Sequence, residues 1–290
     1  MTRNNYTIME NENKDNPYIL PIAVVIAGVM IAGSLIYNAG DSVPQTKAIK
    51  DAVSLNNANG IVLPVTWGDL GSRIVSAGVI DAVKFKAIYG EREVLDNDGK
   101  LKITNENAGY LLNLFWALGL ASKNPILESG EMTNPKYRGA GNFASTGGWT
   151  IAQSNAMNHY SRHIFFDLTP EQQTLVDKVS RGIYRPCCGN STHFPDCNHG
   201  MAMLGLLELM ASQGVNEEEM WKTALAVNSY WFPDTYLTIA AYMKGKGVDW
   251  KDVNPQEMLG VDYSSAQGYA KIAAQVALPS QQGSGSSCGV

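Results

Sequence analysis

An uncharged and mostly apolar run of 20 residues, from Tyr18 to Tyr37, is the first marked pattern along the chain. This is the length that a helix needs to cross the ~30 Å hydrocarbon core of a bilayer. The tyrosines at its two ends suit the membrane interface, where amphipathic rings are favoured. The pattern predicts a transmembrane anchor at residues 17–38, after a disordered tail at residues 1–16. A cleaved signal peptide and a buried helix of a soluble domain are the alternatives.

Beyond this run, residues 39–60 are polar and poor in aromatic side chains, which predicts a stalk. Two stretches with helical periodicity come next, at residues 69–77 and 81–89. Residues 93–103 then alternate in polarity around Asp98-Gly99, a strong signal for a β-hairpin. We therefore expect residues 61–103 to form a small subdomain of helices and one hairpin.

The rest of the chain has mainly helical spacing, so residues 104–278 are predicted to form a helical domain. Residues 122–148 are rich in glycine and are predicted to be a loop. Thr169-Pro170-Glu171-Gln172 has the cap, proline and glutamine of a helix start. Helices are expected at residues 104–121, 149–166, 170–182 and 198–214, from 217, 234 and 255 onward, and at 265–277. The Gly/Ser-rich residues 279–290 are predicted to be a flexible tail. The expected fold class is mainly α: one transmembrane helix, then an all-α globular domain with one small β-hairpin.

The charge pattern limits the partners that the protein can have. The net charge is −5, only 17% of the residues are charged, and lysine and arginine form no cluster. This argues against a nucleic-acid partner, because phosphate binding depends on grouped positive charge. Basic residues flank the apolar run almost equally, so they do not decide its orientation in the membrane. A short N-terminal tail followed by a large C-terminal domain favours an N-terminus on the cytoplasmic side. The predicted location is the cell membrane, crossed once, with the C-terminal domain extracytoplasmic.

Histidine and cysteine are concentrated in one part of the sequence. The chain has four of each, and all four histidines and three cysteines lie between residues 159 and 199. Imidazole and thiolate are the usual ligands of zinc and of copper, and iron accepts them as well. The candidate ligands are Cys187, Cys188, His193, Cys197, His199, His159 and His163.

The spacing divides these candidates into two groups. His159 and His163 are four residues apart on a predicted helix, so their imidazoles would lie on one face. The turn-rich residues 185–200 contain the other five candidates. Cys197 stands at a predicted helix start, where the dipole favours the thiolate, and Asp196 could orient a ligating imidazole. The helix between the groups is about 18 Å long, so they could be two sites, with the cysteines ranked first.

The cysteine segment resembles the small secreted proteins named for a Pro-Cys-Tyr-Cys-Gly-Cys motif. The residues that carry the resemblance, within about residues 180–230, are Pro186, Cys187, Cys188, His193, Asp196 and Cys197. This chain lacks one cysteine of the motif and its spacing is shorter. A metal-binding role has been suggested for that family. The resemblance implies an extracytoplasmic location but no particular activity.

The sequence therefore predicts a membrane-anchored metal-binding protein that takes part in metal handling. A disulfide-stabilised structural or interaction module is the main alternative, because cysteines pair in oxidising compartments. A metal-dependent enzyme is the other alternative, and it would need a metal-bound water. Such an enzyme would also need a free coordination position and an adjoining cleft. Glu208, the single charge in an apolar helix, could be a ligand or could support one.

Overall fold

The computed structural model describes residues 59–90 and 97–276, which belong to one unit, Ala48–Val290. The predicted tail, the anchor, most of the stalk and the Gly/Ser-rich end with Cys288 lie outside the described residues. Within the described ranges, no helix combines the length and the apolar character that a membrane span requires.

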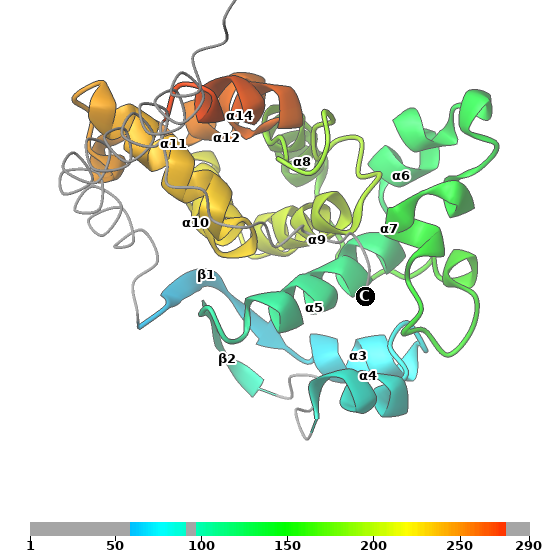
Figure 1. The fold of residues 1–290 in the computed structure, drawn as a ribbon. Helices are drawn as coiled ribbons and strands as arrows, with labels where there is room; N and C mark the ends of the chain where they lie inside the picture. Colours follow the sequence, from blue (N-terminus) through cyan, green and yellow to red (C-terminus); the bar gives the residue numbers. More distant parts are fainter. Residues whose placement is uncertain (1–58, 91–96, 277–290) are drawn as a thin grey trace, which may run out of the picture. The chain divides into compact units, whose positions relative to one another are not determined.

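Two long helices, α5 (Ala108–Ala121) and α9 (Asn198–Ser212), lie side by side at the centre of the fold (Figure 1). α5 is apolar on all sides, and such a helix is stable only when it is surrounded by protein. The two helices approach closely where glycine removes a side chain from each. A Cβ atom on Gly119 would lie 2.0 Å from the carbonyl oxygen of Met201, and one on Gly205 would lie 2.3 Å from that of Phe115.

The β part of the fold is a two-stranded antiparallel sheet of β1 (Ile61–Gly68) and β2 (Asn97–Ile103). Helices α3 (Leu70–Ser76) and α4 (Ala82–Tyr89) lie between the strands in sequence. A mainly helical fold with one two-stranded β element is thus confirmed. The turn expected at Asp98-Gly99 is wrong, because both residues lie inside β2 and the partner strand is β1. β1 supplies that partner because its alternate residues are buried in the core.

The remaining helices form the C-terminal half and begin close to the predicted positions, except α13, which was not predicted. They are α8 (Pro170–Gly182), α10 (Glu217–Trp231), α11 (Pro233–Gly245), α12 (Pro255–Leu259), α13 (Val261–Ser264) and α14 (Ala266–Ala273). The predicted capping box of α8 is present. The Gln172 backbone N–H donates to the Thr169 hydroxyl, and the Thr169 N–H donates to the Gln172 side chain.

The helix predicted at residues 149–166 does not form. This segment contains only a 3-10 turn, Ala156–Asn158, among irregular backbone. Its backbone is used in tertiary contacts instead: Ile151 accepts from the Asp81 N–H at 2.8 Å, and Gln153 donates to Gly78 at 3.0 Å. The segment is therefore held by backbone hydrogen bonds to Gly78 and Asp81 in place of helical ones.

Two smaller predictions also change. Thr104 does not cap α5, which begins after Asn107, and the Asn107 side chain instead accepts a hydrogen bond from the Thr104 N–H. The predicted loop at residues 122–148 contains the short helices α6 (Pro125–Ser129) and α7 (Ala144–Gly147). It also contains 3-10 turns at Glu131–Thr133, Pro135–Tyr137 and Ala140–Asn142. Asparagine and proline start several of these short turns, which is why they follow one another without a long helix.

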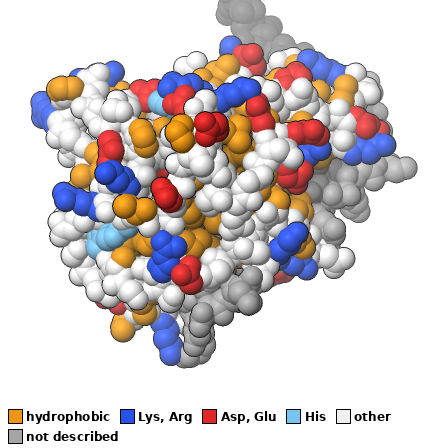
Figure 2. All heavy atoms as spheres, turned by 180° about the vertical axis from the view of Figure 1, so that it is seen from behind, with side chains coloured by type: hydrophobic (Ala, Val, Ile, Leu, Met, Phe, Trp, Pro, Cys, Tyr) orange, Lys and Arg blue, Asp and Glu red, His pale blue; other side chains and the backbone are white. Residues whose placement is uncertain are grey.

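The face of the molecule seen in Figure 2 carries acidic and basic side chains interspersed with apolar ones. Neither sign of charge dominates that face.

Candidate metal centre

The cysteines are placed by the segment that joins α8 to α9, residues 183–197, which we call the cysteine loop. The loop folds back on itself through an antiparallel bridge between Tyr184 and Ser191. The Thr192 N–H also donates to the Ile183 carbonyl at 2.7 Å. This reversal brings the arm that carries Cys187 and Cys188 opposite the start of α9.

The last helices of the chain hold the loop from outside. The Tyr184 N–H donates to the Leu259 carbonyl at 2.8 Å, and the Ala266 N–H donates to the Cys188 carbonyl at 2.9 Å. Ala266 is the first residue of α14, and N–H groups at a helix start have no partner within their own helix. The Cys188 carbonyl thus completes the start of α14 while its side chain belongs to the candidate site.

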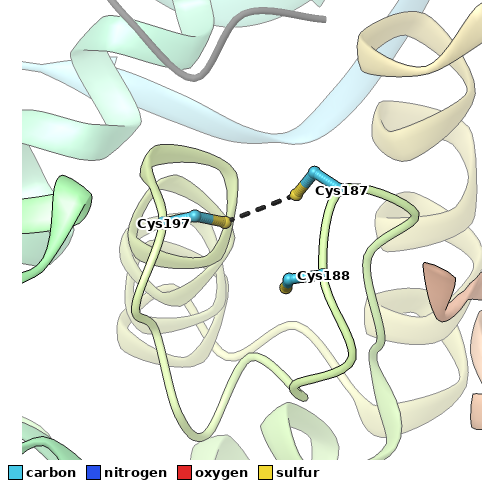
Figure 3. Close-up of side chains that lie close together, drawn as sticks. All are labelled: Cys187, Cys188 and Cys197. Carbon is cyan, nitrogen blue, oxygen red and sulfur yellow. Dashed lines mark hydrogen bonds between the residues drawn. The ribbon is translucent and has the colours of Figure 1, made fainter.

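Three thiols converge in this loop. The sulfur atoms of Cys187, Cys188 and Cys197 all lie within 4.8 Å of one another, and none of the three residues is in a disulfide. Figure 3 shows Cys197 at the start of α9 facing the arm with the other two. The Cys187 and Cys197 sulfurs are 3.5 Å apart, whereas a disulfide bond is about 2.05 Å long. Zinc–sulfur bonds of ~2.3 Å in a tetrahedral site place sulfurs roughly 3.8 Å apart. The cluster is therefore close enough to bind a metal ion.

Cys197 is the N-cap of α9, as predicted, and its sulfur accepts a hydrogen bond from the Gly200 N–H at 3.4 Å. Hydrogen bonds from Cys187 and Cys188, together with the nearby positive charge of Arg185, hold the pKa of the Cys197 thiol well below its usual range. Its hydrogen bonds with Cys188 and Cys197, and burial, raise the pKa of Cys187. The negative charge of the cluster is consequently favoured on Cys197. The resulting thiolate is the form of cysteine that binds metals.

A fully buried arginine lies against the sulfurs, and sequence reasoning missed it. The Arg185 Nε donates to the Cys197 sulfur and its Nη2 donates to the Cys188 sulfur, both at 3.2 Å. Nη2 also contacts the Asp196 carboxylate at 2.6 Å and the Phe194 carbonyl at 3.2 Å. Nη1 has no hydrogen-bond partner in the described part of the chain. The signal in the sequence was a lone cation directly before Pro186-Cys187-Cys188.

Asp196 has a different role from the one proposed on sequence grounds. It orients no imidazole: one carboxylate oxygen pairs with Arg185, and the other accepts from the Asn190 side-chain amide at 2.8 Å. Burial raises the pKa of Asp196, and the Arg185 charge offsets part of that effect. Asp196 thus fixes the guanidinium in place against the sulfurs.

His193 belongs to the same loop but is engaged elsewhere. Its Nδ1 contacts Glu131 at 2.8 Å, and its Nε2 contacts Asp177 at 2.9 Å. With both ring nitrogens on carboxylates, this side chain joins the 3-10 turn Glu131–Thr133 to α8. The structure does not bring it into the sulfur cluster.

His199, two residues into α9, lies beside the cluster without being part of it. Its buried ring packs on Phe232, with ring centroids 4.3 Å apart, and near Trp231 at 6.0 Å. A hydrogen bond from His199 contributes to the low pKa of Cys197. Its Nδ1 atom has no hydrogen-bond partner among the described residues.

His159 and His163 form a pair, although the helix expected to align them is absent. Their rings stack with centroids 5.4 Å apart, and Nδ1 of His159 is 3.1 Å from Nε2 of His163. Burial lowers the pKa of both imidazoles. The pair contacts Ser154 and Phe165 and pairs with Ser122, and none of these belongs to the cysteine loop. It is therefore a separate feature of the fold.

Glu208 is fully enclosed in α9 and away from the sulfur cluster. One carboxylate oxygen accepts a hydrogen bond from the Asn124 side chain, while the other has no partner among the described residues. Burial raises the pKa of Glu208 well above its usual range. Burial thus favours the neutral form of this side chain, which is not among the clustered ligands.

No protein-family model, curated protein or solved structure matches this chain.

Proposed function

We propose that this chain is a membrane-anchored, extracytoplasmic protein that binds one soft or borderline metal ion through Cys187, Cys188 and Cys197. The observation that supports metal binding is the convergence of three sulfurs within 4.8 Å. Soft thiolates select ions such as zinc and cuprous copper. Two of the three sulfurs also accept hydrogen bonds from Arg185, as ligands in metal sites commonly do from surrounding residues.

The membrane anchor and the extracytoplasmic location are proposed from the sequence. The uncharged run from Tyr18 to Tyr37 supports the anchor, and the resemblance around Pro186 to Cys197 supports the extracytoplasmic side. A protein held at a membrane with a thiol cluster outside the cytoplasm would encounter metal ions before they cross. Metal handling, as opposed to a reaction, is therefore the proposed role.

The test is metal analysis of the purified full-length protein, prepared in detergent under reducing conditions. We expect about one zinc or copper ion per chain. Replacing Cys187, Cys188 and Cys197 together by serine should abolish binding. Cys288→Ser is the matched control, because it removes the one cysteine outside the cluster, and it should leave the metal content unchanged.

The structural alternative has one observation in its favour, the 3.5 Å separation of the Cys187 and Cys197 sulfurs. A small movement would bring this pair to bonding distance. Protein that contains no metal, and a Cys187–Cys197 disulfide found by mass spectrometry of protein isolated without reductant, would replace the metal proposal with the disulfide module.

A further inference from the structure

The number of protein ligands at the cluster limits which metal ion can bind there. This inference rests on the proposed function. In the described residues, only the three sulfurs stand together as a ligand set. The neighbouring side chains that could donate a fourth atom already have partners. Asp196 is shared by Arg185 and Asn190, and His193 is held between Glu131 and Asp177.

His199 is the remaining side chain with a suitable donor, and its position is fixed by packing. Its ring lies against Phe232, and its interaction with the cluster is a hydrogen bond to Cys197. The ring lies against Phe232 and near Trp231, and it does not stand among the three sulfurs. The geometry thus gives a site with three sulfurs and no nitrogen.

Coordination number separates zinc from cuprous copper. Structural zinc sites almost always have four ligands in a tetrahedron. Cuprous copper is the softer ion and is selected by thiolate ligands. A set of three sulfurs without a fourth protein ligand therefore fits copper better than a structural zinc ion.

The buried guanidinium supports the same choice. Three thiolates around a monovalent ion carry two net negative charges, which is one more than around a divalent ion. The two hydrogen bonds from Arg185 to the Cys188 and Cys197 sulfurs are charge-assisted and stabilise such an excess. Arginine stays protonated under all conditions in which proteins fold, so this compensation is permanent.

We propose that the cluster binds a single cuprous ion through the sulfurs of Cys187, Cys188 and Cys197, with no nitrogen ligand from the protein. Copper enters as the monovalent ion, so no electron is transferred. Each thiol that still holds a proton releases it to the solvent as its copper–sulfur bond forms. His199 and Arg185 remain outside the coordination sphere.

The test uses the full-length protein loaded with one equivalent of cuprous copper without oxygen, and separately with zinc. X-ray absorption at the copper edge should show three sulfur neighbours and no nitrogen. His199→Phe keeps an aromatic ring against Phe232 but removes both nitrogens. The copper spectrum should keep its three sulfur neighbours. Copper affinity, measured against a competing chelator, should fall by about tenfold at most, because the variant removes a hydrogen bond to Cys197 and no ligand.

Cys188→Ser is the positive control and should weaken copper binding by about 100-fold or more, since it removes a ligand outright. His199→Ala, checked by circular dichroism, covers the case in which the phenylalanine variant does not fold. A copper spectrum with a nitrogen neighbour that disappears in the His199 variants would overturn the inference and leave the proposed function standing. So would a zinc site with three sulfurs and one nitrogen, bound in preference to copper. Binding of neither ion would remove the proposed function itself.

Discussion

Gly200 and Arg185 are in such close contact that a Cβ atom at residue 200 would lie 2.6 Å from the guanidinium carbon. The guanidinium therefore lies directly on the first turn of α9, where any side chain would displace it. Because the guanidinium is the end of a flexible side chain, it can move without unfolding the helix. Residue 200 thus controls the hydrogen bonds between Arg185 and the sulfurs.

Gly200→Ala should weaken metal binding by about 10–100-fold, the usual effect of disturbing residues that support metal ligands. The far-ultraviolet circular dichroism spectrum should not change. Gly189→Ala is the matched control in the same loop, because a Cβ atom there would meet nothing within 4 Å. Equal metal affinities for the two variants, measured by chelator competition, would show that Arg185 does not support the site.

Gly119→Ala should destabilise the fold by about 1–3 kcal/mol, because the added carbon would meet the backbone of α9 at Met201 and Gly205. Gly109→Ala on the same helix is the control, since its position is open. It should be neutral or stabilising by up to about 1 kcal/mol. Urea unfolding followed by tryptophan fluorescence measures both. A neutral result for Gly119→Ala would contradict the close packing of α5 and α9.

Glu208 should make stability depend on pH. Its pKa is raised in the folded protein, so the folded state keeps a proton that the unfolded chain loses above about pH 4.5. This stabilising contribution is complete below that pH and is lost as the pH rises toward the folded-state pKa, by up to ~1.4 kcal/mol per pH unit.

The measurement is the free energy of unfolding of Glu208→Gln and of the parent across this pH range. The variant should lack the decline, so that the difference between the two proteins grows with pH. The exposed Glu128→Gln should follow the parent. Parallel curves for Glu208→Gln and the parent would show that Glu208 is not held neutral.

The full-length protein should stay with membranes during an alkaline carbonate wash. Ile26→Asp with Val29→Asp should release it, because each charge at a helix centre costs about 3 kcal/mol of insertion free energy. Mass spectrometry of the membrane fraction should find residues 18–37 intact. Their absence from the mature protein would favour a cleaved signal peptide.

Cys288 reports the side of the membrane on which the C-terminal domain lies. A thiol reagent that cannot cross membranes should label it in intact cells, and Cys288→Ser should remove this labelling. Labelling only after lysis, with the thiol shown to be reduced, would place the domain in the cytoplasm.

Local signals in the sequence predicted much of the fold. The capping box at Thr169 and the start of α9 at Cys197 depend on neighbouring residues, and both are present. The segment 149–166 does not form the predicted helix, and its backbone bonds to Gly78 and Asp81 instead, a pairing distant in sequence that its own periodicity cannot reveal. β2 likewise pairs with β1, from which helices α3 and α4 separate it in sequence.

In the candidate site, too, local features could be predicted and contacts distant in sequence could not. Cys187, Cys188 and Cys197 share one short loop, so their proximity could be predicted from spacing alone. His193 was predicted with them, but Glu131 and Asp177, which lie far from it in sequence, hold both of its nitrogens. Arg185 was missed because an arginine beside cysteines has no recognisable spacing. Its importance appears only when its burial is known.

The hydrogen bond from the Ala266 N–H to the Cys188 carbonyl makes the start of α14 a neighbour of the cluster, although α14 supplies no ligand. An ion that restricts the motion of Cys188 would also restrict the first turn of that helix. Because such coupling is reciprocal, the ordered helix would in turn favour the metal-bound state of the loop. An ion at the sulfurs would therefore slow amide exchange in residues 266–273. Helix α14 would then report occupancy of a site to which it supplies no ligand.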